Sequence, residues 1–246
     1  MDLLNGKVGS LYFKYLSAAF GSALISSIYG IVDMAMVGQD QGPNGTAALA
    51  VVAPVWNVIY SIGLLMGIGG SVIFSTKRGS GMSADGEDDQ YFTAAVIGSV
   101  ILAALAWVGL ILFERPLLMF FGTDETLLAL AQRYMIPVKV VFPLFLFNQM
   151  LAAFLRNDGA PALATLGVRS GSIFNVLGDW FFVFPCDMGV YGAGLATALG
   201  SAVSFLVMLT HFASRKNTLR LVKPKRLARK SRLTKRGHRR IIIAEF

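Results

Sequence analysis

Two aspartates, Asp33 and Asp179, interrupt long apolar stretches of this sequence and are the residues best placed to do chemistry. Asp33 lies in SIYGIVDMAMVG, and Asp179 lies in SIFNVLGDWFFVF. An ionisable side chain at the centre of a bilayer costs about 2.5 to 3.5 kcal/mol on insertion scales, so each aspartate requires a partner or a function. Asn175 precedes Asp179 by one helical turn, and Tyr29 precedes Asp33 by the same spacing.

These side chains, together with Thr197, offer the carboxylate, amide and hydroxyl oxygens that a hard monovalent cation needs when it leaves water. Two neighbouring carboxyl groups could instead share a proton, one of them being held neutral by the other. The alternative is that each aspartate is hydrated near the headgroups or bonded to backbone. We expect a site that loads and unloads sodium or a proton, with no other cofactor or metal.

The stretches that position these residues have the composition of a membrane protein. Hydrophobic residues make up 55% of the 246 residues, charged residues only 15%, and the mean hydropathy is +0.62. A spanning helix needs about 20 mostly apolar residues, and six stretches qualify. They are residues 11–38, 46–76, 92–113, 134–155, 161–184 and 189–213. The sequence therefore predicts an all-α membrane protein, a six-helix transmembrane bundle over residues 1–214.

Turn and loop residues separate the predicted spans. Gly, Pro and Asn are frequent in residues 39–45, 156–161 and 185–192, and residues 77–90 are polar. Residues 114–133 are predicted to form a short interfacial helix, with Thr123 or Asp124 as its N-cap. In this arrangement Asp33 and Asp179 lie at the same depth, roughly 8 Å inside the outer helix ends at a rise of 1.5 Å per residue.

Basic residues predict the orientation. Residues 1–214 hold 9 Lys and Arg against 13 Asp and Glu, whereas residues 215–246 hold 13 Lys and Arg and a single Glu. The short loops on the side of the tail are also the more basic, which places both termini in the cytoplasm of a multi-pass cell-membrane protein. No aromatic residues interleave with the basic tail, so we expect it to lie on anionic lipid headgroups and not to bind nucleic acid.

Other polar positions carry weaker predictions. Asn148, Gln149 and Asn57 lie within predicted spans and are candidates to line a substrate cavity, although packing between helices would also explain them. An enzyme is not expected. The sequence has only two histidines, His211 and His238, and no motif of a catalytic nucleophile or metal site.

The residues resemble those of the multidrug and toxic compound extrusion (MATE) exporters. The resemblance covers about residues 8–222 and rests on five motifs, of which the fourth is the most specific. They are IVDMAMVGQ, GTAALAVVAP, GIGGS, LRNDGAPALATLGVRSGSIFNVLGDWFFVF and GVYGAGLATALGS. It implies a fold of about twelve helices in two six-helix halves, of which this chain is the first. It also implies antiport, in which sodium or proton entry drives the export of small amphipathic, often cationic compounds.

The same resemblance implies a cation site in the first half. Family members similar to this chain use an Asp on the first helix, an Asn and an Asp four apart on the fifth, and a Thr on the sixth. Those positions are Asp33, Asn175, Asp179 and Thr197, and Tyr29 matches a Tyr one turn before the first Asp. A lipid or polysaccharide flippase of the same superfamily is the alternative, for which a more cationic cavity is expected.

The resemblance ends after about residue 230, where the loop between the two halves should lead to a seventh helix. The last residues, IIIAEF, are too short to span a bilayer. We therefore expect residues 215–246 to form a basic cytoplasmic segment between the halves, disordered or truncated. The chain is then either a half-transporter that pairs with a second six-helix half or a non-transporting fragment of a truncated or frame-shifted gene.

Overall fold

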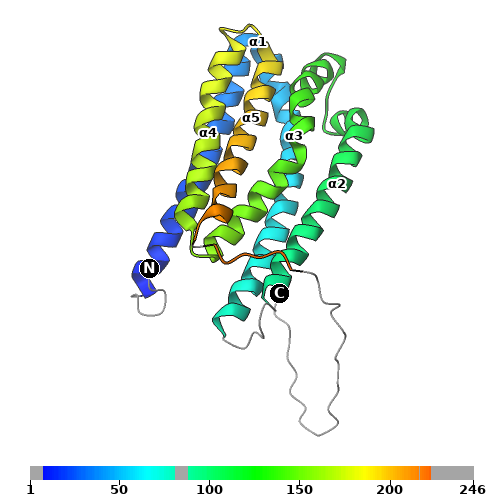
Figure 1. Cartoon of the computed structure of the whole chain (residues 1–246). Helices are drawn as coiled ribbons and strands as arrows, with labels where there is room; N and C mark the ends of the chain where they lie inside the picture. Colours follow the sequence, from blue (N-terminus) through cyan, green and yellow to red (C-terminus); the bar gives the residue numbers. More distant parts are fainter. Residues whose placement is uncertain (1–7, 81–87, 216, 223–246) are drawn as a thin grey trace.

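The structure, a computed structural model, describes residues 8–80, 88–215 and 217–222, and these ranges contain helices and no strand. The helices are α1 (Val8–Gly79), α2 (Asp89–Phe120), α3 (Glu125–Asn157), α4 (Pro161–Val183) and α5 (Gly189–Leu209), followed by the 3₁₀ turn η1 (Thr210–Ala213). They lie side by side in one elongated bundle (Figure 1). The prediction of an all-α bundle is confirmed.

Helix α1 is two helical segments joined at Gly42. The backbone of Gly42 has φ 66° and ψ −155°, a conformation that residues with a Cβ avoid. Pro43 follows and starts the second segment, where its missing N–H is not needed. The chain reverses at this break, so the two segments run side by side (Figure 1). The turn predicted at residues 39–45 therefore exists, and α1 contains two of the predicted spans.

The surface of the bundle is that of a membrane protein. Four stretches are both long and apolar enough to cross a bilayer: Gly30–Gly79, Asp89–Phe120, Glu125–Asn157 and Gly189–Ala213. Helix α4, with 23 residues, is long enough to span a bilayer but carries Arg169, Asn175 and Asp179 within it. Large apolar side chains such as Leu105, Leu112 and Phe120 are 65%, 67% and 82% exposed. Such a surface is stable against acyl chains but not against water.

The interfacial helix predicted at residues 114–133 is not a single helix. A kink at Phe113 (φ −117°, ψ 17°), three residues before Pro116, sets off a short helical stretch that ends at Phe120. Proline removes one hydrogen bond and crowds the preceding turn, which bends a helix without necessarily ending it. The chain then turns and α3 begins at Glu125, capped by Asp124, whose Oδ1 accepts from Leu127 N at 2.8 Å. The N-cap prediction is confirmed for Asp124.

Arg78 closes the end of the bundle at which α1 finishes, named here the Arg78 end. Its guanidinium forms ion pairs with Asp88 at 2.5 Å, with Asp158 at 3.3 Å and with Asp89 at 3.4 Å. It also lies over the ring of Phe74, 4.2 Å from the ring centroid. One cation thereby connects the end of α1, the start of α2 and the turn between α3 and α4.

Residues 217–222 form an extended strap across this end of the bundle (Figure 1). Asp158 accepts hydrogen bonds from the backbone N of Thr218, at 3.1 Å, and from its hydroxyl. His211 Nε2 lies 2.7 Å from Asp158 Oδ2, the oxygen that also accepts from Thr218 N, and the side chains of His211 and Asp158 are almost fully buried. Asp158 is therefore the residue that fastens the strap to the bundle.

The strap moves the end of the bundle beyond Ser214, the boundary expected from the sequence. Leu219 is 3% exposed and packs in an apolar cluster with Phe92 and Phe154. The basic tail expected from residue 215 onward is thus ordered against the bundle over 217–222, because its few apolar side chains can be buried there. Residues 223–246, with the prediction that they lie on lipid headgroups, are outside the described part of the chain.

Replacing the Asp158 carboxylate should destabilise the fold. In Asp158→Ala, His211 and Thr218 lose their acceptor and Arg78 loses one of its ion pairs. Removing one partner of a buried ion pair typically costs about 3 kcal/mol or more. We expect a loss of that size in the free energy of unfolding, measured by tryptophan fluorescence during denaturation in mixed micelles.

The control is Glu125→Ala at the other end of the bundle. Glu125 pairs with Arg115 at 2.8 Å, but the two side chains are 74% and 59% exposed. Exposed pairs contribute about 1 kcal/mol or less. Equal losses in the two variants would show that Asp158 does not fasten this end.

Candidate functional site

A chain of hydrogen bonds links four helices in the half of the bundle nearer the break in α1. The Tyr134 hydroxyl of α3 donates to Asp33 Oδ2 of α1 at 3.0 Å and lies 3.1 Å from Thr197 Oγ1 of α5. Asn175 Nδ2 of α4 donates to Thr197 Oγ1 at 3.1 Å and to Asp179 Oδ1 at 3.5 Å. These five residues form one continuous polar group, named here the carboxylate cluster.

The carboxylate cluster is buried and has unused acceptors. Asp33 is 6% exposed and Asp179 is 0% exposed. Among the described residues, Asp33 Oδ1, Asn175 Oδ1 and Asp179 Oδ2 have no hydrogen-bond partner, and neither aspartate forms an ion pair. A buried charge without a counter-charge is costly. The cluster therefore has the donor set and the electrostatic demand of a site for a monovalent cation or a proton.

Four of the five residues predicted for the cation site come together in this way. They are Asp33, Asn175, Asp179 and Thr197, and their convergence from three helices agrees with the expectation of one layer at similar depth. The side chain of the fifth, Tyr29, lies outside what the structure describes. That the four bind a cation remains a prediction.

Tyr134 is the member of the cluster that the sequence did not indicate. It is 2% exposed and bridges Asp33 to Thr197. A tyrosine at the start of a span is usually an anchor in the headgroup region. Its role depends on the neighbouring helices, and the sequence around it contains no signal of that contact.

Small residues allow α5 to approach the helices on either side of it. A Cβ on Gly194 would lie 2.1 Å from the carbonyl oxygen of Tyr134 in α3. A Cβ on Gly178 in α4 would lie 2.9 Å from the side chain of Ala196. Close backbone approach through small residues is how membrane helices pack, and here it places Thr197 between α3 and α4.

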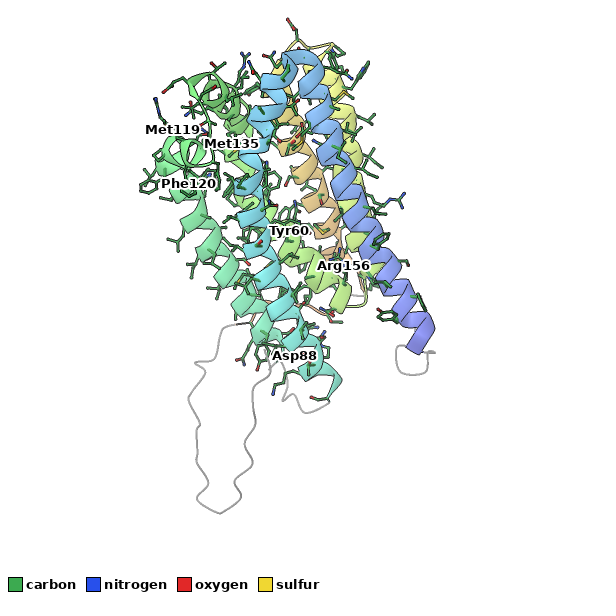
Figure 2. The ribbon with its side chains drawn as sticks, turned by 180° about the vertical axis from the view of Figure 1, so that it is seen from behind. Tyr60, Asp88, Met119, Phe120, Met135 and Arg156 are labelled. Atoms are coloured by element: carbon green, nitrogen blue, oxygen red, sulfur yellow. The ribbon has the colours of Figure 1, made fainter. Side chains whose placement is uncertain are left out.

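A cavity of about 260 Å³ adjoins the carboxylate cluster, between the two segments of α1, α3 and α5. Three members of the cluster, Asp33, Tyr134 and Thr197, line it. Two of the residues predicted for a substrate cavity, Asn57 and Gln149, line it as well. Figure 2 looks onto the two segments of α1, and Tyr60, another lining residue, lies at mid-height on the second segment.

Asn148, the third predicted cavity residue, lies elsewhere. It lines a smaller pocket of about 80 Å³ together with Gln149, Asn175 and Thr197. Its Nδ2 donates to the backbone oxygen and to the hydroxyl of Ser201, at 3.0 and 2.9 Å. Adjacent residues on a helix point about 100° apart, so Asn148 faces α5 and does not line the larger cavity.

Most of the chain matches a model of a known protein family. The family model described as MatE matches residues 18–181, a range that includes Asp33, Tyr134, Asn175 and Asp179. The chain belongs to the MatE family. Thr197 lies beyond the matched range.

Named relatives of this MatE chain are export proteins and not enzymes. The multidrug export protein MepA of Staphylococcus saprophyticus is 25% identical over 191 residues, which are 77% of this chain and 42% of that protein. MepA of Staphylococcus aureus is 23% identical over 206 residues, 82% of this chain and 45% of its own length. The chain thus spans less than half the length of these relatives.

Solved structures share the fold of this MatE chain. An inward-facing multidrug resistance MATE family transporter of the MOP superfamily superposes with a TM-score of 0.72 and 25% identity, over 80% of this chain and 46% of that one. An outward-facing structure with the same description has a TM-score of 0.73 and 24% identity, over 82% and 44%. The described bundle therefore corresponds to one half of such a transporter.

Adding a methyl group at Gly194 should force α3 and α5 apart. The clash in Gly194→Ala is with backbone, which cannot rotate away, and overpacking of this kind costs about 1 to 3 kcal/mol. We expect that loss in the free energy of unfolding. Gly109→Ala is the control, because no atom lies within 4 Å of its Cβ position and alanine favours a helix. An unchanged stability of Gly194→Ala would contradict the close approach.

Proposed function

We propose that this chain is the first half of a cation-coupled antiporter that exports small amphipathic or cationic compounds. One observation carries the proposal: Asp33, Tyr134 and Thr197 belong both to the carboxylate cluster and to the wall of the cavity. A cation bound by the cluster and a compound bound in the cavity would therefore contact the same side chains. Each would change the affinity for the other, which is the requirement for coupling.

The proposed mechanism is a competition between two occupants. A cation at Asp33 and Asp179 neutralises the cluster and draws Asp33 toward α4 and α5, which moves the first segment of α1 and reshapes the cavity. A cationic compound in the cavity is attracted by the same Asp33 when the cation has left. A ligand shifts such an equilibrium only through its different affinity for the two states. Sodium and a proton both fit the cluster, and the coupling ion is one of these.

The shape and charge of the cavity support this class of substrate. Its lining is largely apolar, with Trp56, Phe145 and Tyr60 as aromatic surfaces, and Asp33 is the one charged residue that lines it in the described chain. Apolar walls with few polar groups suit amphipathic compounds. A flippase for anionic lipids or polysaccharides would need cationic groups here, so export of amphipathic or cationic compounds is the better proposal.

A complete transporter of the proposed kind needs a second six-helix half besides this chain. The matched part of this chain covers 42% and 45% of the two relatives, so we propose that a second six-helix half covers the open side of the cavity. From the distribution of Lys and Arg, we place the Arg78 end on the cytoplasmic side of a cell membrane and the break in α1 on the outer side.

Neutralising either aspartate should uncouple transport. In Asp33→Asn and Asp179→Asn the cation loses a carboxylate, and losing about 1.4 kcal/mol of cation binding is already a tenfold effect. We expect ethidium efflux by cells that carry the complete transporter to fall at least about tenfold, with normal amounts of protein in the membrane. Efflux and ion dependence are measured by ethidium fluorescence with sodium and pH varied independently.

The matched control is Asp40→Asn. Asp40 lies on the same α1 segment, but its carboxylate bonds to the neighbouring Gln41 at 2.8 Å, outside the cluster. Its efflux should equal that of the unmodified protein. Normal efflux by both Asp33→Asn and Asp179→Asn would remove the proposed function.

Filling the cavity should block export without removing the cation site. Ala53 lines the cavity, and in Ala53→Trp the indole would occupy much of its volume. We expect ethidium efflux to fall at least about tenfold, while sodium-dependent or pH-dependent protection of the purified protein against unfolding is retained. Ala104→Trp is the control, because Ala104 is exposed on α2, away from the cavity. Equal efflux by the two tryptophan variants would show that compounds do not use this cavity.

A further inference from the structure

The pocket of about 80 Å³ that contains Asn148 is unusually polar for the interior of a membrane protein. It lies between α3, α4 and α5, on the Arg78 side of the carboxylate cluster. Seven oxygen-bearing side chains line it: Asn148, Gln149, Ser172, Asn175, Thr197, Ser201 and Ser204. Two of them, Asn175 and Thr197, also belong to the carboxylate cluster, so the two sites share a wall.

Two carboxamide oxygens in this pocket are buried without a hydrogen-bond partner among the described residues, Asn148 Oδ1 and Asn175 Oδ1. Asn148 is 9% exposed and Asn175 is 3% exposed. The Nδ2 of Asn148 donates to Ser201. The Nδ2 of Asn175 donates to Thr197 and Asp179. Each carboxamide is therefore held by its donor side, and its oxygen is the polar atom left for a ligand.

The two buried oxygens without a partner, Asn148 Oδ1 and Asn175 Oδ1, are acceptors, so a ligand that meets both of them is a donor or a cation. The Ser172 hydroxyl donates to Val168 O at 3.0 Å, so its oxygen can still accept a hydrogen bond. No charged residue lines the pocket within the described chain, and Asp179 lies one helical turn from Asn175. At about 30 Å³ per water molecule, the volume holds two or three small occupants. These properties suit a monovalent cation that keeps part of its water shell.

We propose that this pocket is a second cation station, at which uncharged oxygens hold a partly hydrated monovalent cation next to the carboxylate cluster. The inference rests on the proposed function and adds a step to it. A site without a carboxylate binds a cation less tightly than the cluster does. Passage of an ion needs such a site, at which binding is favourable enough for entry and weak enough for release.

The surroundings of the station indicate where the cation goes. On the Arg78 side the pocket is closed by apolar packing, in which Met208 and Phe154 are fully buried and a Cβ on Gly167 would lie 2.5 Å from Met208. On the other side, Phe145, Gln149 and Thr197 line both the pocket and the 260 Å³ cavity. The cation therefore passes from the cluster to the station and leaves through the cavity when the cavity opens to the cytoplasm.

Crystals of the chain soaked in a thallous salt test the station directly. Thallous ion is a monovalent cation that is located by its anomalous scattering. We expect one anomalous peak between Asp33 and Asp179 and a second between Asn148 and Asn175. A peak at the aspartates alone would overturn the station and leave the proposed function standing. The absence of both peaks would overturn both, and a peak at the station alone would support the station but not the proposed carboxylate site.

Single-residue variants should affect the two anomalous peaks differently. In Asn148→Leu the second peak should disappear and the first should remain. Ser201→Ala, a smaller change, should weaken the second peak. The matched control is Ser99→Ala, which removes a fully buried hydroxyl bonded to Met150 Sδ, outside the pocket, and should leave both peaks unchanged. Persistence of the second peak in Asn148→Leu and Ser201→Ala would overturn the assignment of these residues.

Discussion

The burial of two carboxylates that have no cationic partner among the described residues is the constraint on which this structure depends. Asp33 and Asp179 can be kept out of contact with acyl chains only if the helices around them close completely, because an unshielded charge in the bilayer is not tolerated. The glycines of α4 and α5 permit that closure, and Tyr134 supplies the bond between α1 and α5. The burial of the two carboxylates therefore depends on the close packing of the helices around them.

Buried carboxylates have different surroundings at the Arg78 end and in the carboxylate cluster. At the Arg78 end, Arg78 and His211 accompany the carboxylates, and the strap adds donors to Asp158. These contacts hold α1, α2, η1 and the turn between α3 and α4 together. The carboxylate cluster, by contrast, keeps acceptors unused. In the proposed function, a cation that binds and leaves meets these acceptors.

The sequence by itself determined the class of protein, the helical segments and the polar positions that require an explanation. Composition and the length of apolar runs are local properties, and they decide which segments lie in a membrane. Turn residues such as Gly42, and the cap at Asp124, are equally local, because their effect is on the adjacent backbone. The pairing of Asn175 with Asp179 follows from the helical repeat alone.

Only the tertiary structure decided which side chains meet across helices. Tyr134 joins the cluster, Asn148 faces a different space from Gln149, and residues 217–222 fold back onto the bundle. Two helical stretches of α2 also meet at a kink at Phe113, and α3 begins only at Glu125, so residues 114–133 form no single helix. Such contacts depend on the rotation, depth and separation of helices that lie far apart in sequence. No local pattern encodes these three quantities, since they result from the packing of the whole bundle.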